Sequence, residues 1–169
     1  MKAIIILFTT ILMVACNKEN AEIDKSKDYM YVDNKLDLII KDTNGVNVLN
    51  TILGYDDIDI VYFENGKEKI FYNPMLDASK GYFINEFNSN YYFRLFLNLP
   101  KEGSKESFTY MRIKQGSIKE FKSEFEVNKD ETGIDGGNSI VLKRVWLNNT
   151  LFLDKTKEIT SELPSLIFE

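Results

Sequence analysis

The residues of this chain that could do chemistry are acids and aromatic rings, because the sequence contains no histidine and only one cysteine, Cys16. Without histidine there is no Ser-His-Asp or Cys-His nucleophile, no histidine general base and almost no catalytic zinc site. Two acids about 5 to 10 Å apart can still hydrolyse a glycosidic bond. Asp56, Asp57 and Asp59 are candidates, with Asp57 and Asp59 on one side of an expected strand. In a chain with 26 acidic residues, however, a solvated start of a strand is the preferred interpretation.

A second candidate is the segment 128–138, which is rich in Asp, Asn and Gly and whose opening is similar to that of an EF-hand calcium loop. The twelfth position of such a loop would be Ser139, where a bidentate Glu is required, and the pattern indicates no flanking helices. A calcium site of another kind would use Asp130, Asp135 and Asn138. A plain connection between two strands is the favoured interpretation.

Aromatic rings form the third candidate site, because Trp and Tyr present flat apolar faces with a polar edge and can stack on the face of a sugar ring. Trp146, Tyr62 and Tyr110 lie within expected strands and are the candidates for such a platform. Residues at alternating strand positions are more often part of the core. If Trp146 belonged to the core, its replacement by alanine would unfold the domain rather than weaken binding.

The elements that would position these side chains are strands, since period-2 alternation and turn signals are much more frequent than helical periodicity. The clearest unit is a hairpin with strands over 58–63 and 68–72, joined through Asn65-Gly66, which can adopt the positive φ values of a type I′ turn. Further strands are expected over 35–41, 91–97, 108–114, 118–127, 139–147 and 150–153. The tail 155–169 holds either a short helix broken by Pro164 or a final edge strand over 165–168.

About seven to nine short strands, spaced roughly 10 to 15 residues apart, predict an all-β domain built as an antiparallel β-sandwich, immunoglobulin-like or similar. A small antiparallel β-barrel is the alternative. The strand over 118–127 alternates apolar residues with Lys and Glu, which indicates a sheet with one face in water. A single domain over 29–169 is long enough to bury about two-thirds of its unfolded surface.

The amino terminus has the order of a secretory signal: Lys2, an apolar segment from Ala3 to Met13, and small residues before Cys16. The apolar segment is about a dozen residues long, whereas a helix that crosses a bilayer needs roughly 20. Residues 1–15 are therefore expected to be a cleaved signal peptide.

Met13-Val14-Ala15-Cys16 resembles the lipobox of bacterial lipoproteins. The resemblance implies that signal peptidase II cleaves before Cys16, and that this residue carries a diacylglycerol on its thiol and an acyl chain, such as palmitate, on its amino group. Several acyl chains hold a protein on a membrane, whereas one chain binds only marginally. Residues 16–28 are then the lipidated cysteine and a charged, flexible tether.

The residues after Cys16 also indicate a location. Many lipoproteins that stay in the inner membrane have Asp directly after the lipidated cysteine. This chain has Asn17 there, which favours the outer membrane. The charged residues that follow resemble the surface-export signals of Bacteroidota lipoproteins, so display on the cell surface is slightly favoured over the periplasmic face. The whole chain is similar to short Bacteroidota-type outer-membrane lipoproteins with a β-rich domain.

Cleavage would remove Lys2 and no acid, leaving 20 basic and 26 acidic side chains and changing the net charge from −5 to −6. A nucleic-acid partner is not expected, because such binding needs a basic stripe and here lysines alternate with acids. The sequence predicts a non-catalytic binding module, held on the envelope by its lipid and recognising a glycan, a peptide or a partner lipoprotein. No cofactor is expected. The alternative is a small carboxylate-dependent hydrolase acting on envelope polysaccharide.

Overall fold

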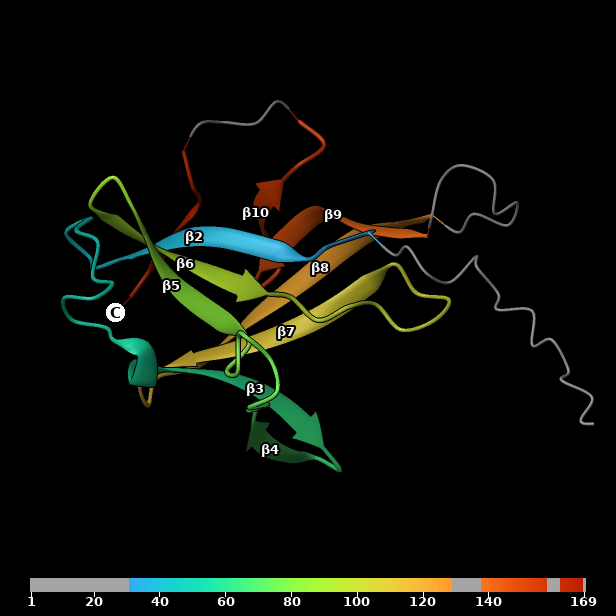
Figure 1. Cartoon of the computed structure of the whole chain (residues 1–169), viewed down its shortest axis with the longest axis horizontal. Helices are drawn as coiled ribbons and strands as arrows, with labels where there is room; N and C mark the ends of the chain where they lie inside the picture. The colour runs from blue at the N-terminus through green and yellow to red at the C-terminus, as the bar shows by residue number, and fades with distance from the viewer. Residues whose placement is uncertain (1–30, 129–137, 158–161, 169) are drawn as a thin grey trace, which may run out of the picture.

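A computed structural model describes residues 31–128, 138–157 and 162–168 of the chain. Within these residues the protein is all-β, with two sheets packed face to face, and Figure 1 shows β2, β5 and β6 lying across β7 and β8. The sheets do not close into a barrel, so the predicted β-sandwich is confirmed and the barrel is excluded. No helix long and apolar enough to cross a membrane occurs in the described part of the chain.

The larger sheet has seven strands. In spatial order they are β1 (Tyr31–Asp33), β9 (Ser139–Leu147), β8 (Ile118–Asn128), β7 (Glu106–Ile113), β3 (Ile58–Glu64) and β4 (Lys67–Ile70), and β10 (Thr150–Asp154) pairs with β9. The smaller sheet has four strands, in the order β11 (Ser165–Ile167), β2 (Lys35–Lys41), β6 (Asn90–Phe96) and β5 (Tyr82–Phe87). The 3-10 turn η2 (Tyr55–Asp57) leads into β3.

The hairpins follow the predicted turn chemistry. Between β3 and β4, Asn65 and Gly66 have φ values of 52° and 75°, as a type I′ turn requires. Between β9 and β10, Asn148 and Asn149 have φ values of 47° and 68°. Asn tolerates the left-handed region because its short polar side chain can bond locally. These two turns fix the register of their hairpins.

The sheets are mixed rather than purely antiparallel, which corrects one part of the prediction. β1 runs parallel to β9, and β11 runs parallel to β2. Both are three-residue strands near the two ends of the described chain, and each lies along an edge of an otherwise antiparallel sheet. Of the two alternatives for the tail, the edge strand is confirmed, and it covers Ser165–Ile167.

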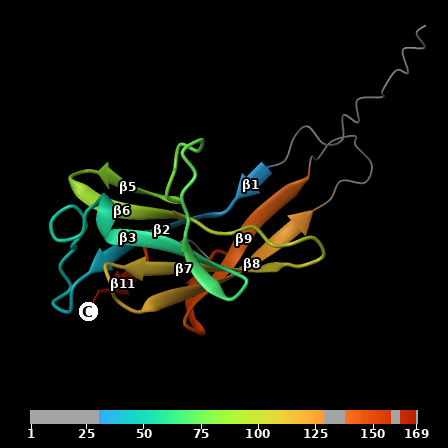
Figure 2. The ribbon, with the colours of Figure 1, turned by 90° about the horizontal axis from the view of Figure 1, so that it is seen from below.

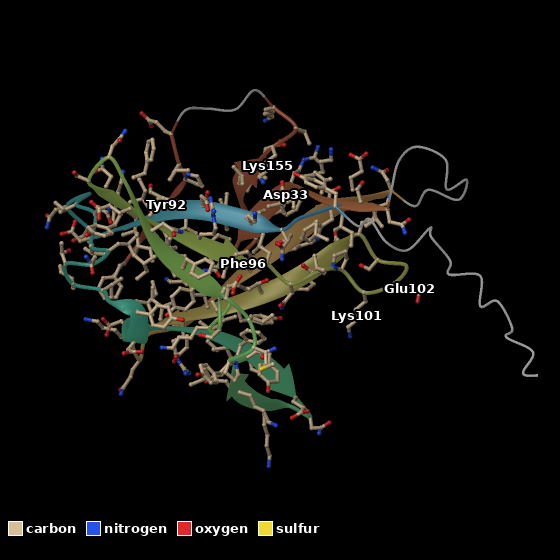
Figure 3. All side chains as sticks on the ribbon, in the orientation of Figure 1. Asp33, Tyr92, Phe96, Lys101, Glu102 and Lys155 are labelled. Atoms are coloured by element: carbon tan, nitrogen blue, oxygen red, sulfur yellow. The ribbon has the colours of Figure 1, made fainter. Side chains whose placement is uncertain are left out.

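The first strand is tied to the end of β10 by an ion pair. Lys155 Nζ lies 3.0 Å from Asp33 Oδ2 and also donates to the carbonyl of Lys35, and Figure 3 shows Asp33 and Lys155 side by side. The main-chain N–H of Tyr31 donates to the carbonyl of Asn138. The described chain therefore begins beside the start of β9, at the end of the larger sheet where β8 finishes, as Figure 2 shows.

The core fills the space between the sheets. The smaller sheet contributes Leu36, Leu38, Ile40, Tyr82, Phe93 and Leu95, and the larger sheet contributes Ile58, Ile60, Met111, Phe121, Phe125, Leu142 and Val145. In β2 and β8 these side chains come from alternate positions, so the intervening residues point to the outer face, whereas in β9 a register shift separates Leu142 from Val145 by three positions. The outward positions of the larger sheet are where candidate functional side chains lie.

Candidate functional site

Strand β7 carries two aromatic side chains on the outer face of the larger sheet. Thr109 and Met111 are fully buried against the smaller sheet, so Phe108 and Tyr110, which alternate with them, point the other way. Phe108 remains 42% exposed, and Tyr110 is partly buried. Two rings on one strand face lie about 7 Å apart along the strand, which is a spacing that one extended ligand can span.

Two neighbouring strands add further rings to the same face. On β3, Val61 is registered with Tyr110, so Phe63, two residues on, also points outward and meets the Tyr110 ring edge-on, with 5.2 Å between the ring centroids. On β9, Trp146 is registered with Lys122 of β8, which is in turn registered with Phe108. We call Phe63, Phe108, Tyr110 and Trp146 the aromatic face.

Cross-strand ion pairs lie among these rings. Lys122 Nζ lies 2.8 Å from Glu106 Oε1, and it stands over the Trp146 ring at 5.5 Å from the centroid. Farther along the same face, Arg144 is 3.0 Å from Glu124. Exposed pairs of this kind contribute little to stability, roughly 0 to 1 kcal/mol each. They do hold charged groups beside the rings in fixed positions.

The phenol of Tyr110 has a raised pKa. Partial burial raises its pKa, and the neighbouring carboxylate of Glu120, which is registered with it, raises it further by repulsion and by accepting its hydrogen bond. The neutral phenol is thus the favoured form in the folded protein, and it stays a hydrogen-bond donor at neutral pH.

Replacing Glu120 by glutamine is expected to bring the pKa of Tyr110 back toward its ordinary value, because it removes a negative charge without removing the burial. Since the folded-state pKa is raised, Tyr110 contributes stability that is present below the ordinary pKa of tyrosine and is lost as pH rises through the folded value. Tyrosinate absorbance titration, with Tyr110→Phe subtracted, measures the shift. An unchanged titration in Glu120→Gln would contradict the assignment.

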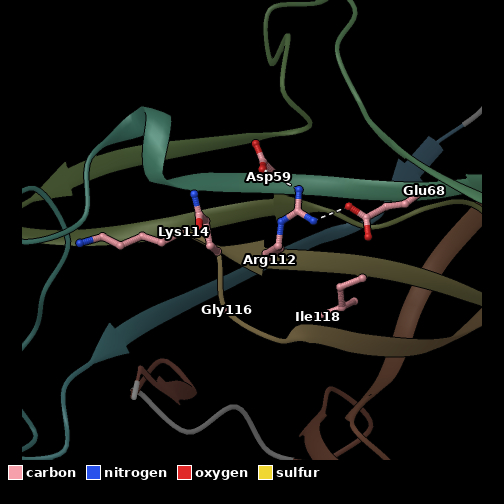
Figure 4. A pocket seen from close by; sticks show the side chains of 7 residues that line it. Asp59, Glu68, Arg112, Lys114, Gly116 and Ile118 are labelled. Carbon is pink, nitrogen blue, oxygen red and sulfur yellow. Dashed lines mark hydrogen bonds and ion pairs between the residues drawn. The ribbon is translucent and has the colours of Figure 1, made fainter.

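An open hollow of about 500 Å³ lies on the same outer face, next to the aromatic face, and Figure 4 shows the side chains that line it. Among its lining residues is Arg112, whose guanidinium donates one hydrogen bond to Asp59 at 3.1 Å and another to Glu68. The hydrogen bonds that Arg112 donates, first to Asp59 and second to Glu68, raise the pKa of Arg112. The guanidinium lies between the two carboxylates, where a substrate bond would have to lie in a two-acid hydrolase.

The other two acids of the predicted cluster have separate roles. Asp57 belongs to η2 rather than to the strand, and its side chain accepts from the N–H of Gly54 at 2.8 Å, which caps that turn. Asp56 points into solvent and pairs with Lys80 at 2.7 Å. The three carboxylates therefore do not converge on one site, contrary to the expectation that Asp57 and Asp59 share one side of a strand.

The structure brings two of the three predicted platform residues onto one face. Trp146 and Tyr110 both belong to the aromatic face, on β9 and β7. Tyr62 lies between Val61 and Phe63, so it points to the opposite side of β3, in phase with buried Ile60, and is 40% exposed because the smaller sheet does not cover it. Tyr62 cannot share a ligand face with the other two.

The remaining predicted residues are mostly outside the described part of the chain. Cys16, Asp130 and Asp135 lie there, and the calcium hypothesis stays a prediction. Asn138 immediately precedes β9, and its carbonyl accepts from Tyr31. Among the described residues, no group of three or more His, Cys, Asp or Glu side chains is placed to hold a metal ion.

Two members of the aromatic face were not among the predicted residues. Phe108 stands two residues before Tyr110 in one strand, so strand periodicity alone could have placed it on the same face. Phe63 required the register between β3 and β7, which joins residues about 50 positions apart.

The described residues thus define a β-sandwich with an aromatic outer face on its larger sheet and a hollow in which Arg112 lies between Asp59 and Glu68. No family model, curated protein or solved structure matches the chain. Its function has to be argued from the site itself.

Proposed function

We propose that this protein is a lipid-anchored lipoprotein of the cell envelope, and that its β-sandwich is a non-catalytic module that binds a glycan on the aromatic face. The anchor is Cys16 of the lipobox-like sequence, and outer-membrane attachment with display on the cell surface is the favoured arrangement. The observation that supports binding most directly is the set of Phe63, Phe108, Tyr110 and Trp146 on one outer sheet face.

A glycan suits this face better than a peptide or a partner lipoprotein does. The rings are interleaved with ion pairs such as Lys122–Glu106 and Arg144–Glu124. Binding of a protein partner would desolvate those charges, which costs free energy. Charged side chains are depleted at the centre of protein interfaces for that reason. Sugar hydroxyls can hydrogen-bond to the same groups while the sugar's apolar face stacks on a ring. Trp146 is partly exposed, with Lys122 over its ring.

The alternative hydrolase is less well supported. Asp59 and Glu68 are both bound to Arg112, and this guanidinium occupies the space between them. A glycosidase needs one acid free to donate a proton and the second free to act as nucleophile or base. An ion-paired triad of this kind is a common structural device at a sheet surface.

The test is a thermal-shift screen of the soluble chain that starts at Asn17 against oligosaccharides and peptidoglycan fragments. A ligand at 100 times its dissociation constant stabilises the folded state by about 2.7 kcal/mol, which is a measurable shift. We expect Phe108→Ala and Tyr110→Ala to abolish the shift, because each removes a ring from the stacking surface, while leaving the unliganded protein folded.

Tyr92→Ala is the matched control. Tyr92, labelled in Figure 3, lies on β6, on the outer face of the other sheet, and Arg94 stands over its ring at 5.7 Å from the centroid. The Tyr92→Ala substitution removes an equally large ring that is not part of the aromatic face. A saccharide shift that survives Phe108→Ala and disappears in Tyr92→Ala would contradict the site, and a complete absence of saccharide shifts would contradict the glycan ligand.

A further inference from the structure

The free edge of β5 has the properties of a strand-pairing site. β5 is the last strand of the smaller sheet, and β6 is its one hydrogen-bonded neighbour among the described strands. All six of its residues, Tyr82 to Phe87, pair with β6 in continuous register without a bulge. An edge of this length offers a row of main-chain donors and acceptors to another strand. Figure 2 shows β5 at the margin of its sheet.

The hydrogen-bonding pattern between β5 and β6 shows which main-chain groups of β5 face the open edge. Phe96 N–H donates to the carbonyl of Gly81, so Gly81 and the alternate residues after it direct their main-chain groups toward β6. The amides and carbonyls of Ile84 and Glu86 therefore point away from β6, to the open edge. No hydrogen bond joins these groups to another described residue.

The other described edges carry the features that prevent such pairing. β4 contains two lysines, Lys67 and Lys69, within four residues. β1 and β11 are only three residues long, and β10 has an irregularity between Leu151 and Leu153. Short strands, lysines and bulges are the usual protections of an edge. β5 has no lysine, no proline and no bulge, and its one charged side chain is that of Glu86.

The sequence of β5 is also complementary to itself. On its outer side Phe83 and Phe87 stand symmetrically about Asn85, and Phe87 is 71% exposed. A two-fold axis through Asn85 would place Phe83 of each copy opposite Phe87 of the other. Phenylalanine pairs across strands stabilise a sheet. The same axis puts Glu86 opposite Ile84, so that the two carboxylates do not face each other.

We propose that two copies of this chain associate through antiparallel pairing of their β5 strands about Asn85. Ile84 of each copy forms a hydrogen-bonded pair with Glu86 of the other, and each such pair exchanges two main-chain bonds. The two Asn85 residues lie opposite each other at the axis as a non-hydrogen-bonded pair, because the main-chain groups of Asn85 point toward β6. The axis is perpendicular to the smaller sheet, so both aromatic faces lie on one side of the dimer.

Register-specific cross-linking in the full-length protein on its membrane tests this pairing. At a non-hydrogen-bonded antiparallel pair the opposed β-carbons are about 4.5 to 5.5 Å apart, close to the span of a disulfide. Under mild oxidation, Asn85→Cys is expected to give several-fold more covalent dimer than the unmutated chain, which sets the background. Phe87→Cys is the matched control, because two residues at position 87 would be about 14 Å apart in this register.

A second variant tests the hydrogen bonds. Glu86→Pro in the Asn85→Cys chain removes an edge N–H that β6 does not use, so it should abolish the cross-link and leave the fold intact. Glu86→Thr, which keeps the N–H, should retain the cross-link. Cross-linking of Phe87→Cys as strong as that of Asn85→Cys, or no dimer above background in a folded Asn85→Cys protein, overturns the proposal. A cooperative urea transition establishes folding in each variant.

Discussion

Replacing Cys16 by serine is expected to abolish incorporation of labelled fatty acid and to leave the protein as an unprocessed precursor. The hydroxyl of serine cannot accept the diacylglycerol as the thiol does. In the lipoproteins that the Met13-Val14-Ala15-Cys16 sequence resembles, cleavage depends on that modification. In the proposed lipoprotein each acyl chain contributes about 0.8 kcal/mol per buried methylene to membrane binding, and Cys16→Ser removes this contribution. Metabolic labelling and electrophoretic mobility measure the two effects together.

Asn17→Ser is the matched control for this prediction. It changes the residue next to Cys16 and keeps the lipobox-like sequence, so labelling and cleavage should be unchanged. Equal fatty-acid labelling of Cys16→Ser and the unmutated protein would contradict the lipoprotein assignment. In that case the apolar segment from Ala3 to Met13 would have to act as an ordinary secretory signal.

Replacing Phe93 by alanine is expected to destabilise the sandwich by about 3 to 5 kcal/mol. Phe93 is fully buried, and its ring packs against that of Tyr82 at 4.7 Å between centroids. The truncation leaves a cavity between the sheets that rigid neighbours can fill only in part. Because a domain of this size is stable by about 5 to 15 kcal/mol in total, a large share of the stability would be lost. Urea unfolding of the soluble chain measures the change.

Phe87→Ala is the control for the Phe93 prediction, since it removes the same side chain from a position that is 71% exposed. A surface substitution of this kind changes stability by about 0.5 kcal/mol or less. A loss in Phe87→Ala as large as that in Phe93→Ala would mean that Phe87 is already covered, for example by a second copy. Repeating the measurement over a range of protein concentrations separates that case from an error in the core assignment.

Several elements could be predicted because their signals are local. Asn65-Gly66 and Asn148-Asn149 specify tight turns through residues that adopt positive φ, and the strands beside them alternate apolar and polar residues. The buried face of β8, with Phe121 and Phe125, follows from that alternation alone. The all-β class and the sandwich were therefore accessible from sequence.

The strands that were not predicted carry weaker local signals. β1 has three residues, and β5 has no alternation of apolar and polar positions, because Phe83 and Phe87 lie on its outer side while Tyr82 is buried on its inner side. β5 also begins directly after Gly81, whose φ of +82° is a turn value. The strand conformation of β1 depends on pairing with β9, which is distant in the chain. That of β5 depends on pairing with β6, which is held in place by the core.

The sequence by itself determined the hairpins, the buried side of β8 and the lipobox-like terminus that predicts a membrane anchor. The tertiary structure decided which strands lie side by side, and with that which candidates meet: it joined Tyr110 to Trp146 and Phe63, turned Tyr62 to the other side, and placed Arg112 between Asp59 and Glu68. The physical reason is the two-residue period of a strand. It fixes which residues of one strand share a side, whereas the pairing of distant strands depends on how the whole core packs.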